Sequence, residues 1–354
     1  MKKITAIILL LCVCFALISC GETTPEKTYK TRNRTVSDFY FNTYSQISTY
    51  ADTDDENIER YVKIADEVLS HYHKLFDIYY EHSGINNIKT INKNAGKSPV
   101  NVSTELIDFL EYCKELYTLT NGKTNVMMGS VLKIWHDCRE EADDNFGYLP
   151  KEKLPTEDEL SEAAKHTSID SLIIDREAST VYISDPEASL DVGAIAKGYT
   201  VDIIYKRIKE TDADSVVLNI GGNIRTIGKK PEGGPWVTGL TNPDKDSNEP
   251  LIARLEIGET SLVTSGDYER AFISDNKKYH HIIDPDTLMP SEYFSSVSIL
   301  AKKSGLSDAL STALFCMSYE DGLKLISDIG GIEVIWVTRD GVVKTTDGVR
   351  LISK

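Results

Sequence analysis

The sequence has little cysteine. Six of its 354 residues are cysteines, and only Cys113, Cys138 and Cys316 lie beyond the first 20 positions. Their spacing matches no zinc-binding pattern, and their odd number leaves at least one of them unpaired. Cys113 and Cys316 fall at apolar positions of expected helices, where a thiol behaves as a small hydrophobe. We therefore predict buried, reduced thiols and no structural zinc site.

Positive charge is also scarce. Lysine and arginine together number 39 against 55 aspartates and glutamates, which gives a formal net charge of −16 at pH 7. A chain this acidic does not bind nucleic acid or anionic lipid through a basic face. We expect no nucleic-acid partner.

One long apolar run does occur, over residues 4–18, behind two lysines and ending in the sequence LISC at 17–20. The run is too short to span a membrane and has the form of a secretory signal. A small residue before Cys20 completes a lipobox, which predicts cleavage there and attachment of lipid to Cys20. Acyl chains on Cys20 would anchor the protein to a membrane surface without a spanning helix.

The N-terminal pattern also predicts how the chain is divided. Residues 1–19 are expected to be a lipoprotein signal peptide, and 20–35, which are polar, a flexible tether after lipidated Cys20. The folded domain is then expected over 36–354. This organisation predicts an extracytoplasmic protein, lipid-anchored to the bacterial cell membrane through Cys20.

Internal repeats and a regular βαβ alternation are both missing from the remaining sequence. Apolar residues at helical spacing predict helices in the first half, and strand-like segments dominate from about residue 169. A charged stretch containing two prolines, 137–157, predicts an exposed excursion. The expected helices are 56–76, 104–119, 194–210, 304–316 and 319–328. The expected strands are 172–175, 180–184, 215–220, 223–229, 236–241, 251–257, 279–283, 295–300 and a closing hairpin of 333–337 and 342–345. This mixture predicts the α+β class, with mixed sheets and packed helices.

The stretch LDVGAIAKGYTVD at 190–202 predicts a strand end, a tight turn and a helix start. Gly193 permits close approach of a ligand, and a helix beginning near Ala194 would aim free N–H groups at an anion. Lys197 adds a full positive charge in the first turn, and Asp191 lies just outside it. The alternative is an ordinary strand–turn–helix with a solvated lysine.

A second stretch, SGLSDALSTALF at 304–315, places Asp308 and Thr312 four residues apart on one helix face. A carboxylate and a hydroxyl are hard oxygen donors that suit Mg²⁺ held partly by the protein and partly by phosphates. The alternative is a helix-capping aspartate and a threonine that bonds back to the chain.

Three further segments carry polar groups at turns. Gly221 and Gly222 interrupt an apolar strand pattern, where a ligand can touch the backbone, although a plain hairpin turn explains them as well. Ser265 lies in a polar turn over 263–272. His281 precedes an apolar pair, and it could donate to a phosphate or accept a proton, although a histidine at a strand edge is more often structural.

Together these segments resemble the ApbE family, the FAD:protein FMN transferases, also described as flavin-trafficking lipoproteins. The resemblance covers roughly residues 36–350 and implies one catalytic unit of two intimately packed lobes. The motifs that carry it are DVGAIAKG at 191–198, NIGGN at 219–223, TSGDY at 264–268, HIIDP at 281–285 and DALST at 308–312, with LFDIY at 75–79 and MGSVLKIW at 128–135.

The resemblance implies roles for individual residues. Asp308 and Thr312 would bind Mg²⁺ by side chain and Ala194 by its carbonyl, while Tyr79 or Tyr80 would stack on the isoalloxazine. The remaining contacts to the dinucleotide would come from Met128, Gly129, Asp191, Lys197, Gly221, Gly222, Ser265, His281 and Ile283.

Two departures from the family pattern stand out. Phe41-Asn42-Thr43 replaces Met-Gly-Thr, which weakens a flavin contact for Phe41, and Leu288-Met289-Pro290 replaces Gly-Tyr-Pro.

The implied activity is Mg²⁺-dependent transfer of FMN from FAD, as substrate, to a threonine or serine hydroxyl of a partner flavoprotein. AMP would leave, with Asp308 and His281 as the catalytic residues. The alternatives are an FAD pyrophosphatase, in which water replaces the protein hydroxyl, and a non-catalytic FAD-binding lipoprotein.

Overall fold

The computed structural model describes residues 31–36, 39–50 and 55–352. The expected signal peptide, Cys20 and most of the expected tether lie outside the described residues. Residues Thr31–Thr35, expected to end the tether, instead form strand β1, so ordered structure starts earlier than expected. Within the described ranges, no helix has both the length and the apolar character needed to cross a membrane.

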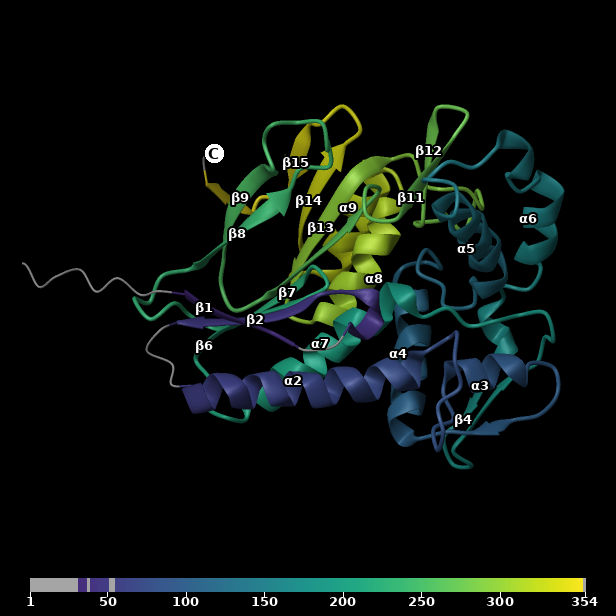
Figure 1. The fold of residues 1–354 in the computed structure, drawn as a ribbon, viewed down its shortest axis with the longest axis horizontal. Helices are drawn as coiled ribbons and strands as arrows, with labels where there is room; N and C mark the ends of the chain where they lie inside the picture. Colours follow the sequence, from purple (N-terminus) through teal and green to yellow (C-terminus); the bar gives the residue numbers. More distant parts are fainter. Residues whose placement is uncertain (1–30, 37–38, 51–54, 353–354) are drawn as a thin grey trace, which may run out of the picture.

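Helices and strands are mixed along the chain (Figure 1). The helices and short 3-10 turns are α2 (Asp55–Phe76), α3 (Ile88–Lys93), α4 (Thr104–Leu119), α5 (Gly129–Asp143), α6 (Glu157–Ala164), α7 (Gly193–Lys209), α8 (Ser304–Phe315), α9 (Tyr319–Ile329), η1 (Tyr40–Asn42), η2 (Lys151–Lys153) and η3 (Ile169–Ser171). The strands are β1 (Thr31–Thr35), β2 (Ser45–Tyr50), β3 (Val100–Asn101), β4 (Leu172–Asp175), β5 (Thr180–Ile183), β6 (Ser215–Ile220), β7 (Asn223–Gly228), β8 (Trp236–Thr241), β9 (Leu251–Ile257), β10 (Ser261–Gly266), β11 (Ala271–Ser274), β12 (Lys277–His280), β13 (Phe294–Ala301), β14 (Glu333–Thr338), β15 (Val343–Thr345) and β16 (Arg350–Ile352).

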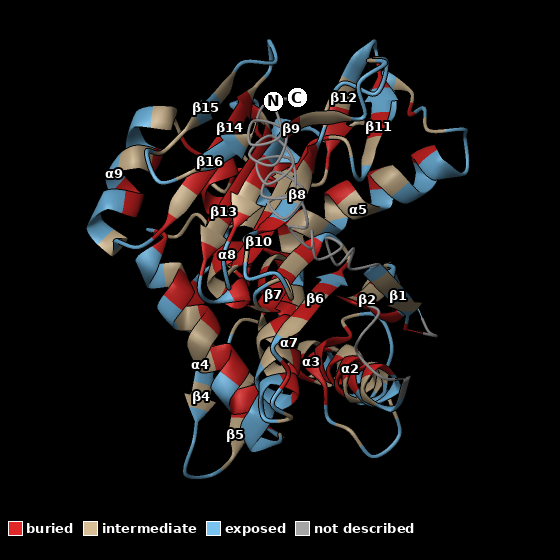
Figure 2. Ribbon diagram, turned by 90° about the vertical axis from the view of Figure 1, so that its left-hand side faces the viewer, coloured by how far each residue is buried: buried red, intermediate tan, exposed pale blue. Residues whose placement is uncertain are grey.

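An antiparallel sheet forms the centre of the molecule. Among the described residues it has eight strands in the order β1-β2-β6-β7-β10-β13-β14-β15. Helices α7 and α8 pack against each other and lie on one face of this sheet, and the long helix α2 packs on α7 (Figure 1). The buried residues concentrate in α8 and the central strands (Figure 2). This is the expected α+β architecture.

A smaller sheet, in the order β16-β9-β8, covers the other face of the large one. Its apolar residues Trp236, Leu240 and Leu255 share a buried cluster with Leu262 and Ile335 of the large sheet. The central strands are therefore covered on both faces, by α7 and α8 on one side and by the smaller sheet on the other.

The elements expected from apolar periodicity are confirmed. Each expected helix matches an observed one to within one residue at either end, and Ser103 caps α4 by accepting the Leu106 N–H. The closing hairpin is also confirmed, as β14 and β15. Cys113 and Cys316 are unpaired and buried, as predicted, and so is Cys138.

Three expectations about local structure were wrong in part. Most of 137–157 is exposed, as expected, but its first residues, 137–143, belong to α5, whose apolar face packs with α6 and β11 in a separate buried cluster. The polar turn containing Ser265 is the end of β10, a central strand whose small polar residues pair with β13. The strand expected over 279–283 ends at His280, so His281 and Ile283 follow it in a connection.

Candidate active site

A cleft of about 1160 Å³ opens beside the N-terminus of α7. Its walls come from segments far apart in the sequence, including the end of α2, the start of α5, α7, α8 and the ends of several strands. Every site residue predicted from the sequence lines it: Tyr79, Met128, Gly129, Asp191, Ala194, Lys197, Gly221, Gly222, Ser265, His281, Ile283, Asp308 and Thr312.

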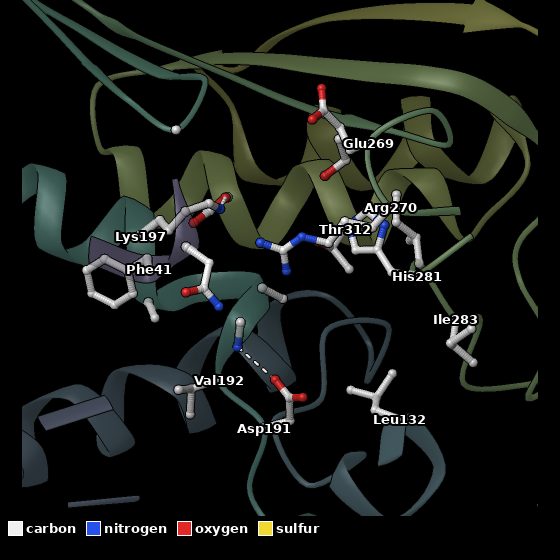
Figure 3. A pocket seen from close by; sticks show the side chains of 18 of the residues that line it. Phe41, Leu132, Asp191, Val192, Lys197, Glu269, Arg270, His281, Ile283 and Thr312 are labelled. Atoms are coloured by element: carbon white, nitrogen blue, oxygen red, sulfur yellow. Dashed lines mark hydrogen bonds and ion pairs between the residues drawn. The ribbon is translucent and has the colours of Figure 1, made fainter. Parts of the chain in front are cut away.

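The first turn of α7 forms one wall of the cleft. Asp191 lies just before the helix, and its Oδ1 accepts the Gly193 N–H at 2.9 Å (Figure 3). Burial raises the pKa of the Asp191 carboxyl, and the Gly193 N–H partly opposes this shift. Gly193 does not have a left-handed backbone conformation. A Cβ at this position would meet only Asp191 Oδ1, at 3.2 Å, so the space beside the residue is otherwise open.

Asp308 connects α8 to this turn. Its Oδ2 accepts the Gly198 N–H at 2.8 Å, and Lys197 Nζ lies 3.4 Å from its Oδ1. Only 5% of Asp308 is exposed, so this carboxylate is largely withdrawn from water at the edge of the cleft. The helix-capping alternative is wrong, because α8 begins at Ser304 and Asp308 reaches across to α7 instead.

The other two predicted metal ligands, Ala194 and Thr312, line the same cleft as Asp308. In a regular helix the Gly198 N–H donates to the Ala194 carbonyl, and here the same N–H donates to Asp308 Oδ2. The Thr312 hydroxyl makes no hydrogen bond within the described chain, whereas Ser307 donates to the carbonyl of Lys303, just before α8, and Ser311 to that of Asp308. The alternative in which the Thr312 hydroxyl bonds back to its own helix is therefore wrong.

These three groups supply few charges. No cluster of three or more His, Cys, Asp or Glu side chains that could hold a metal occurs among the described residues. One carboxylate, one hydroxyl and one carbonyl are hard oxygen donors, and Mg²⁺ commonly takes its remaining ligands from water and phosphate. The donor set therefore fits a magnesium ion that is completed by a phosphate-bearing substrate.

Asp202 holds the two helices together at a second point, which the sequence did not reveal. Its Oδ1 and Oδ2 accept the N–H groups of Ser304 and Gly305, at 2.8 and 2.9 Å. Helix α8 has no cap from its own side chains, so an aspartate of α7 takes that role. Two carboxylates therefore cross between α7 and α8 in opposite directions and fix Asp308 relative to Ala194.

The glycine turn between β6 and β7 closes another side of the cleft. Gly221 and Gly222 have φ angles of +56° and +87°, a region that L side chains rarely adopt. A Cβ on Gly221 would lie 2.5 Å from Thr43 Oγ1, so the turn also needs glycine for space. This is a hairpin turn, as the simpler interpretation held, and it lies in the cleft.

His281 lies in a cationic part of the cleft, near Arg270 and Thr312 (Figure 3). Burial, together with the nearby positive charge of Arg270, lowers the pKa of His281 to about 3, so the ring is neutral at pH 7. Its Nδ1 is buried and has no hydrogen-bond partner in the described structure. A neutral imidazole with an unused nitrogen can accept or donate one proton.

The ApbE family model matches residues 41–336 of this chain. The chain belongs to the ApbE family. Similar proteins named FAD:protein FMN transferase occur in Klebsiella pneumoniae (30% identical, 72% of this chain and 75% of the relative) and Haemophilus influenzae (27%, 92% and 90%). The crystal structure of the ApbE protein from Thermotoga maritima superposes with a TM-score of 0.75 at 27% identity, over 90% of this chain and 97% of that one. The flavin transferase ApbE from Vibrio cholerae gives a TM-score of 0.71 at 25% identity, with the same coverage.

The resemblance to the ApbE family gave two candidates, Tyr79 and Tyr80, for the tyrosine that would stack on the isoalloxazine. Tyr79 lines the cleft, with its ring centroid 5.5 Å from that of His136, whereas Tyr80 does not line it. Both backbone N–H groups donate to Asp77 Oδ1, which fixes the turn that separates the two rings. Of the two, Tyr79 has the position that the stacking role requires.

The departures from the ApbE pattern have different consequences. Phe41 still lines the cleft, although its φ of 55° lies in the left-handed region. Leu288, where the family pattern has glycine, also has a positive φ, of 61°. Its carbonyl accepts the Trp135 indole N–H at 2.9 Å, which helps to hold that strained turn outside the cleft.

Two arginines that line this cleft, Arg139 and Arg270, were not among the predicted site residues. Arg139 lies on α5, within the stretch interpreted as an exposed excursion, and Arg270 follows the TSGDY motif by two residues. Both lie close enough to His281 for their positive charge to lower its pKa. Arg270 could have been predicted as a site residue from its place two residues after the TSGDY motif.

Proposed function

We propose that this chain is an FAD:protein FMN transferase that moves FMN from FAD to a threonine or serine hydroxyl of a partner flavoprotein, with release of AMP. The observation that carries the proposal is the joining of two features in one cleft. The first turn of α7, with Lys197, lines the same cleft as Asp308 and Thr312 of α8, and Lys197 Nζ lies 3.4 Å from Asp308 Oδ1. A diphosphate needs both kinds of group, because N–H donors and cations bind its oxygens and a hard cation neutralises its charge.

Different parts of the cleft have the chemistry to bind different parts of FAD. Lys197 and Arg270, with the Ala194 N–H, would bind the two phosphates, because the Gly193 N–H is taken by Asp191 and those of Ile195 and Ala196 by the Val192 carbonyl. Tyr79 would stack on the flavin ring, and the backbone of the Gly221–Gly222 turn would contact the remaining polar edge. Asp308, Thr312 and the Ala194 carbonyl would hold Mg²⁺, which when bound supplies neutralisation of phosphate charge.

The transfer itself requires one bond to form and one to break. The acceptor hydroxyl oxygen attacks the FMN-side phosphorus, and the bond from that phosphorus to the oxygen bridging to AMP breaks. FMN then remains on the acceptor as a phosphoester. His281, which lines the cleft, takes the hydroxyl proton in this proposal, and Arg270 offsets charge on the phosphate oxygens.

The test is to incubate the purified chain with FAD, Mg²⁺ and a flavoprotein fragment that presents a threonine acceptor. We expect covalent flavin on the fragment, seen as in-gel fluorescence and a mass increase of one FMN, with AMP in equal amount. Free FMN and AMP without covalent flavin would identify a pyrophosphatase instead. Unchanged FAD in a tight complex would identify a carrier.

We also propose that the protein acts outside the cytoplasm, attached to the membrane by lipid on Cys20. The LISC sequence at 17–20 and the polar residues behind it support this placement. Cys20→Ala should move the protein from the membrane fraction to the soluble fraction while transfer activity persists, because Cys20 precedes the domain that forms the cleft. A Cys20→Ala protein that stays in the membrane fraction would contradict the proposal.

A further inference from the structure

Strand β8 presents one edge of its sheet to the cleft. It pairs along its length with β9 only, over Trp236–Thr241, and it is the terminal strand of the β16-β9-β8 sheet as described. Residues 238–241 of this strand line the same cleft as the α7 and α8 residues. In such a strand, alternate backbone N–H and C=O groups point away from the partner strand. Hydrogen-bonding groups of the main chain therefore face the space beside the proposed FAD site.

This edge lacks most of the features that usually prevent a strand from pairing with another chain. Natural sheets protect their edges with charged residues, proline, short strands, β-bulges or a covering segment. The one irregularity of β8 is a shift of its register against β9 between Leu240 and Thr241, at the end of the strand. Strand β8 is six residues long, with the sequence WVTGLT, and has neither a charge nor a proline. The other described edges are short, are covered, or carry charge: Arg32 and Arg34 on β1, Lys344 on β15, Arg350 on β16, Asp175 on β4 and Lys277 and Lys278 on β12. Strand β11, which has no charge, is covered by hydrogen bonds from residues 147–149.

The strand is also held firmly in place. Trp236 and Leu240 are buried against the large sheet, and the Trp236 indole N–H donates to the Gly228 carbonyl at 3.1 Å. On the opposite face of the strand, Val237 and Thr241 are exposed. A rigid edge loses little conformational entropy when a peptide adds to it.

We propose that the cleft-facing edge of β8 receives the acceptor segment of the partner flavoprotein as an added strand. The inference rests on the proposed function, since only transfer to a protein brings a polypeptide into this cleft. Main-chain hydrogen bonds to β8 supply affinity that depends little on sequence. Because side chains alternate along an extended segment, a threonine or serine on one face can enter the cleft while its neighbours stay outside.

Hydrogen exchange of the β8 amides tests the edge directly. The chain is loaded with FAD in EDTA, so that no transfer occurs, and is mixed with the acceptor fragment that the wild-type chain flavinylates. We expect alternate amides within 238–241 to exchange at least about tenfold more slowly when the fragment is present, because they become hydrogen-bonded. Amides of β16, at the far edge of the same sheet, serve as the internal reference and should not change.

A pair of lysine substitutions tests the consequence for catalysis. Thr241→Lys places a protective charge at the cleft end of the strand, and Val237→Lys places the same charge on the same face outside the cleft. Both positions are exposed, so both variants should melt like the wild type. We expect Thr241→Lys to raise the KM for the acceptor about tenfold, a loss comparable to one or two net hydrogen bonds, with Val237→Lys unchanged.

The outcomes separate this inference from the proposed function. Covalent transfer by the wild type without protection of β8, or with an unchanged KM in Thr241→Lys, overturns the docking edge and leaves the transferase intact. Conversion of FAD to free FMN without transfer to any acceptor overturns both. An equal rise of KM in both lysine variants also counts against the edge, because it indicates a general charge effect.

Discussion

Replacing Asp308 by asparagine should slow FMN transfer by about a hundredfold or more, with FAD still bound and the fold retained. Asparagine keeps the size of the side chain and an oxygen that can accept the Gly198 N–H, now at 2.8 Å from Asp308 Oδ2. It removes the negative charge, which is the only formal charge in the proposed ligand set of Asp308, Thr312 and the Ala194 carbonyl. Binding of a hard cation depends strongly on carboxylate charge, so the Mg²⁺ concentration for half-maximal transfer should rise sharply.

The measurements are transfer rate against Mg²⁺ concentration, quenching of FAD fluorescence on binding, and thermal melting. Asp202→Asn is the matched control, because Asp202 also joins α7 to α8 through backbone N–H groups but does not line the cleft. It should lower the melting temperature, while the Mg²⁺ concentration for half-maximal transfer should rise much less than in Asp308→Asn, because every proposed ligand is still present. Near-wild-type transfer by Asp308→Asn at low Mg²⁺ would remove Asp308 from the metal site.

Most of the fold could be predicted because its elements have strong local signals. Helices such as α4 and α7 have an apolar stripe and a definable start, and strand β14 is a nearly continuous apolar run. The failures share a physical cause. Helix α5 and strand β10 owe their conformation to partners distant in sequence, namely β11 for the helix and β7 and β13 for the strand. The local polarity around Ser265 and the local charge around Arg139 therefore predicted a turn and an excursion where the structure has a strand and a helix.

The site could be predicted as a set of residues but not as a geometry. Motifs spread over more than 200 residues meet in one cleft, and spacing along the chain cannot show this. Neither could it show that Asp202 caps a helix about 100 residues away, because that aspartate has no local pattern. Gly198 belongs to a motif that the sequence shows. The requirement for glycine there comes from the close approach of the α8 backbone, which the sequence does not show.

Gly198→Ala should destabilise the protein, although alanine is the better helix former. Within an isolated helix this change would stabilise by about 0.5–1 kcal/mol. Here a Cβ on residue 198 would lie 2.3 Å from the Ser304 carbonyl oxygen and 2.8 Å from Asp308 Cβ, so α7 and α8 must move apart. Overpacking of this kind costs about 1–3 kcal/mol, and we expect a net loss in the free energy of unfolding.

The same movement should also impair the site, because it separates Ala194 on α7 from Asp308 and Thr312 on α8. We expect a higher Mg²⁺ concentration for half-maximal transfer and slower transfer in addition to a lower melting temperature, measured together by calorimetry and by transfer assays. Gly305→Ala is the control at the same helix pair: its Cβ would come no closer than 3.2 Å, to a Tyr112 ring atom, so a slight shift accommodates it. If Gly198→Ala melts at or above the wild-type temperature, the close approach of α7 and α8 does not constrain residue 198. Helix propensity would then decide the effect at this position.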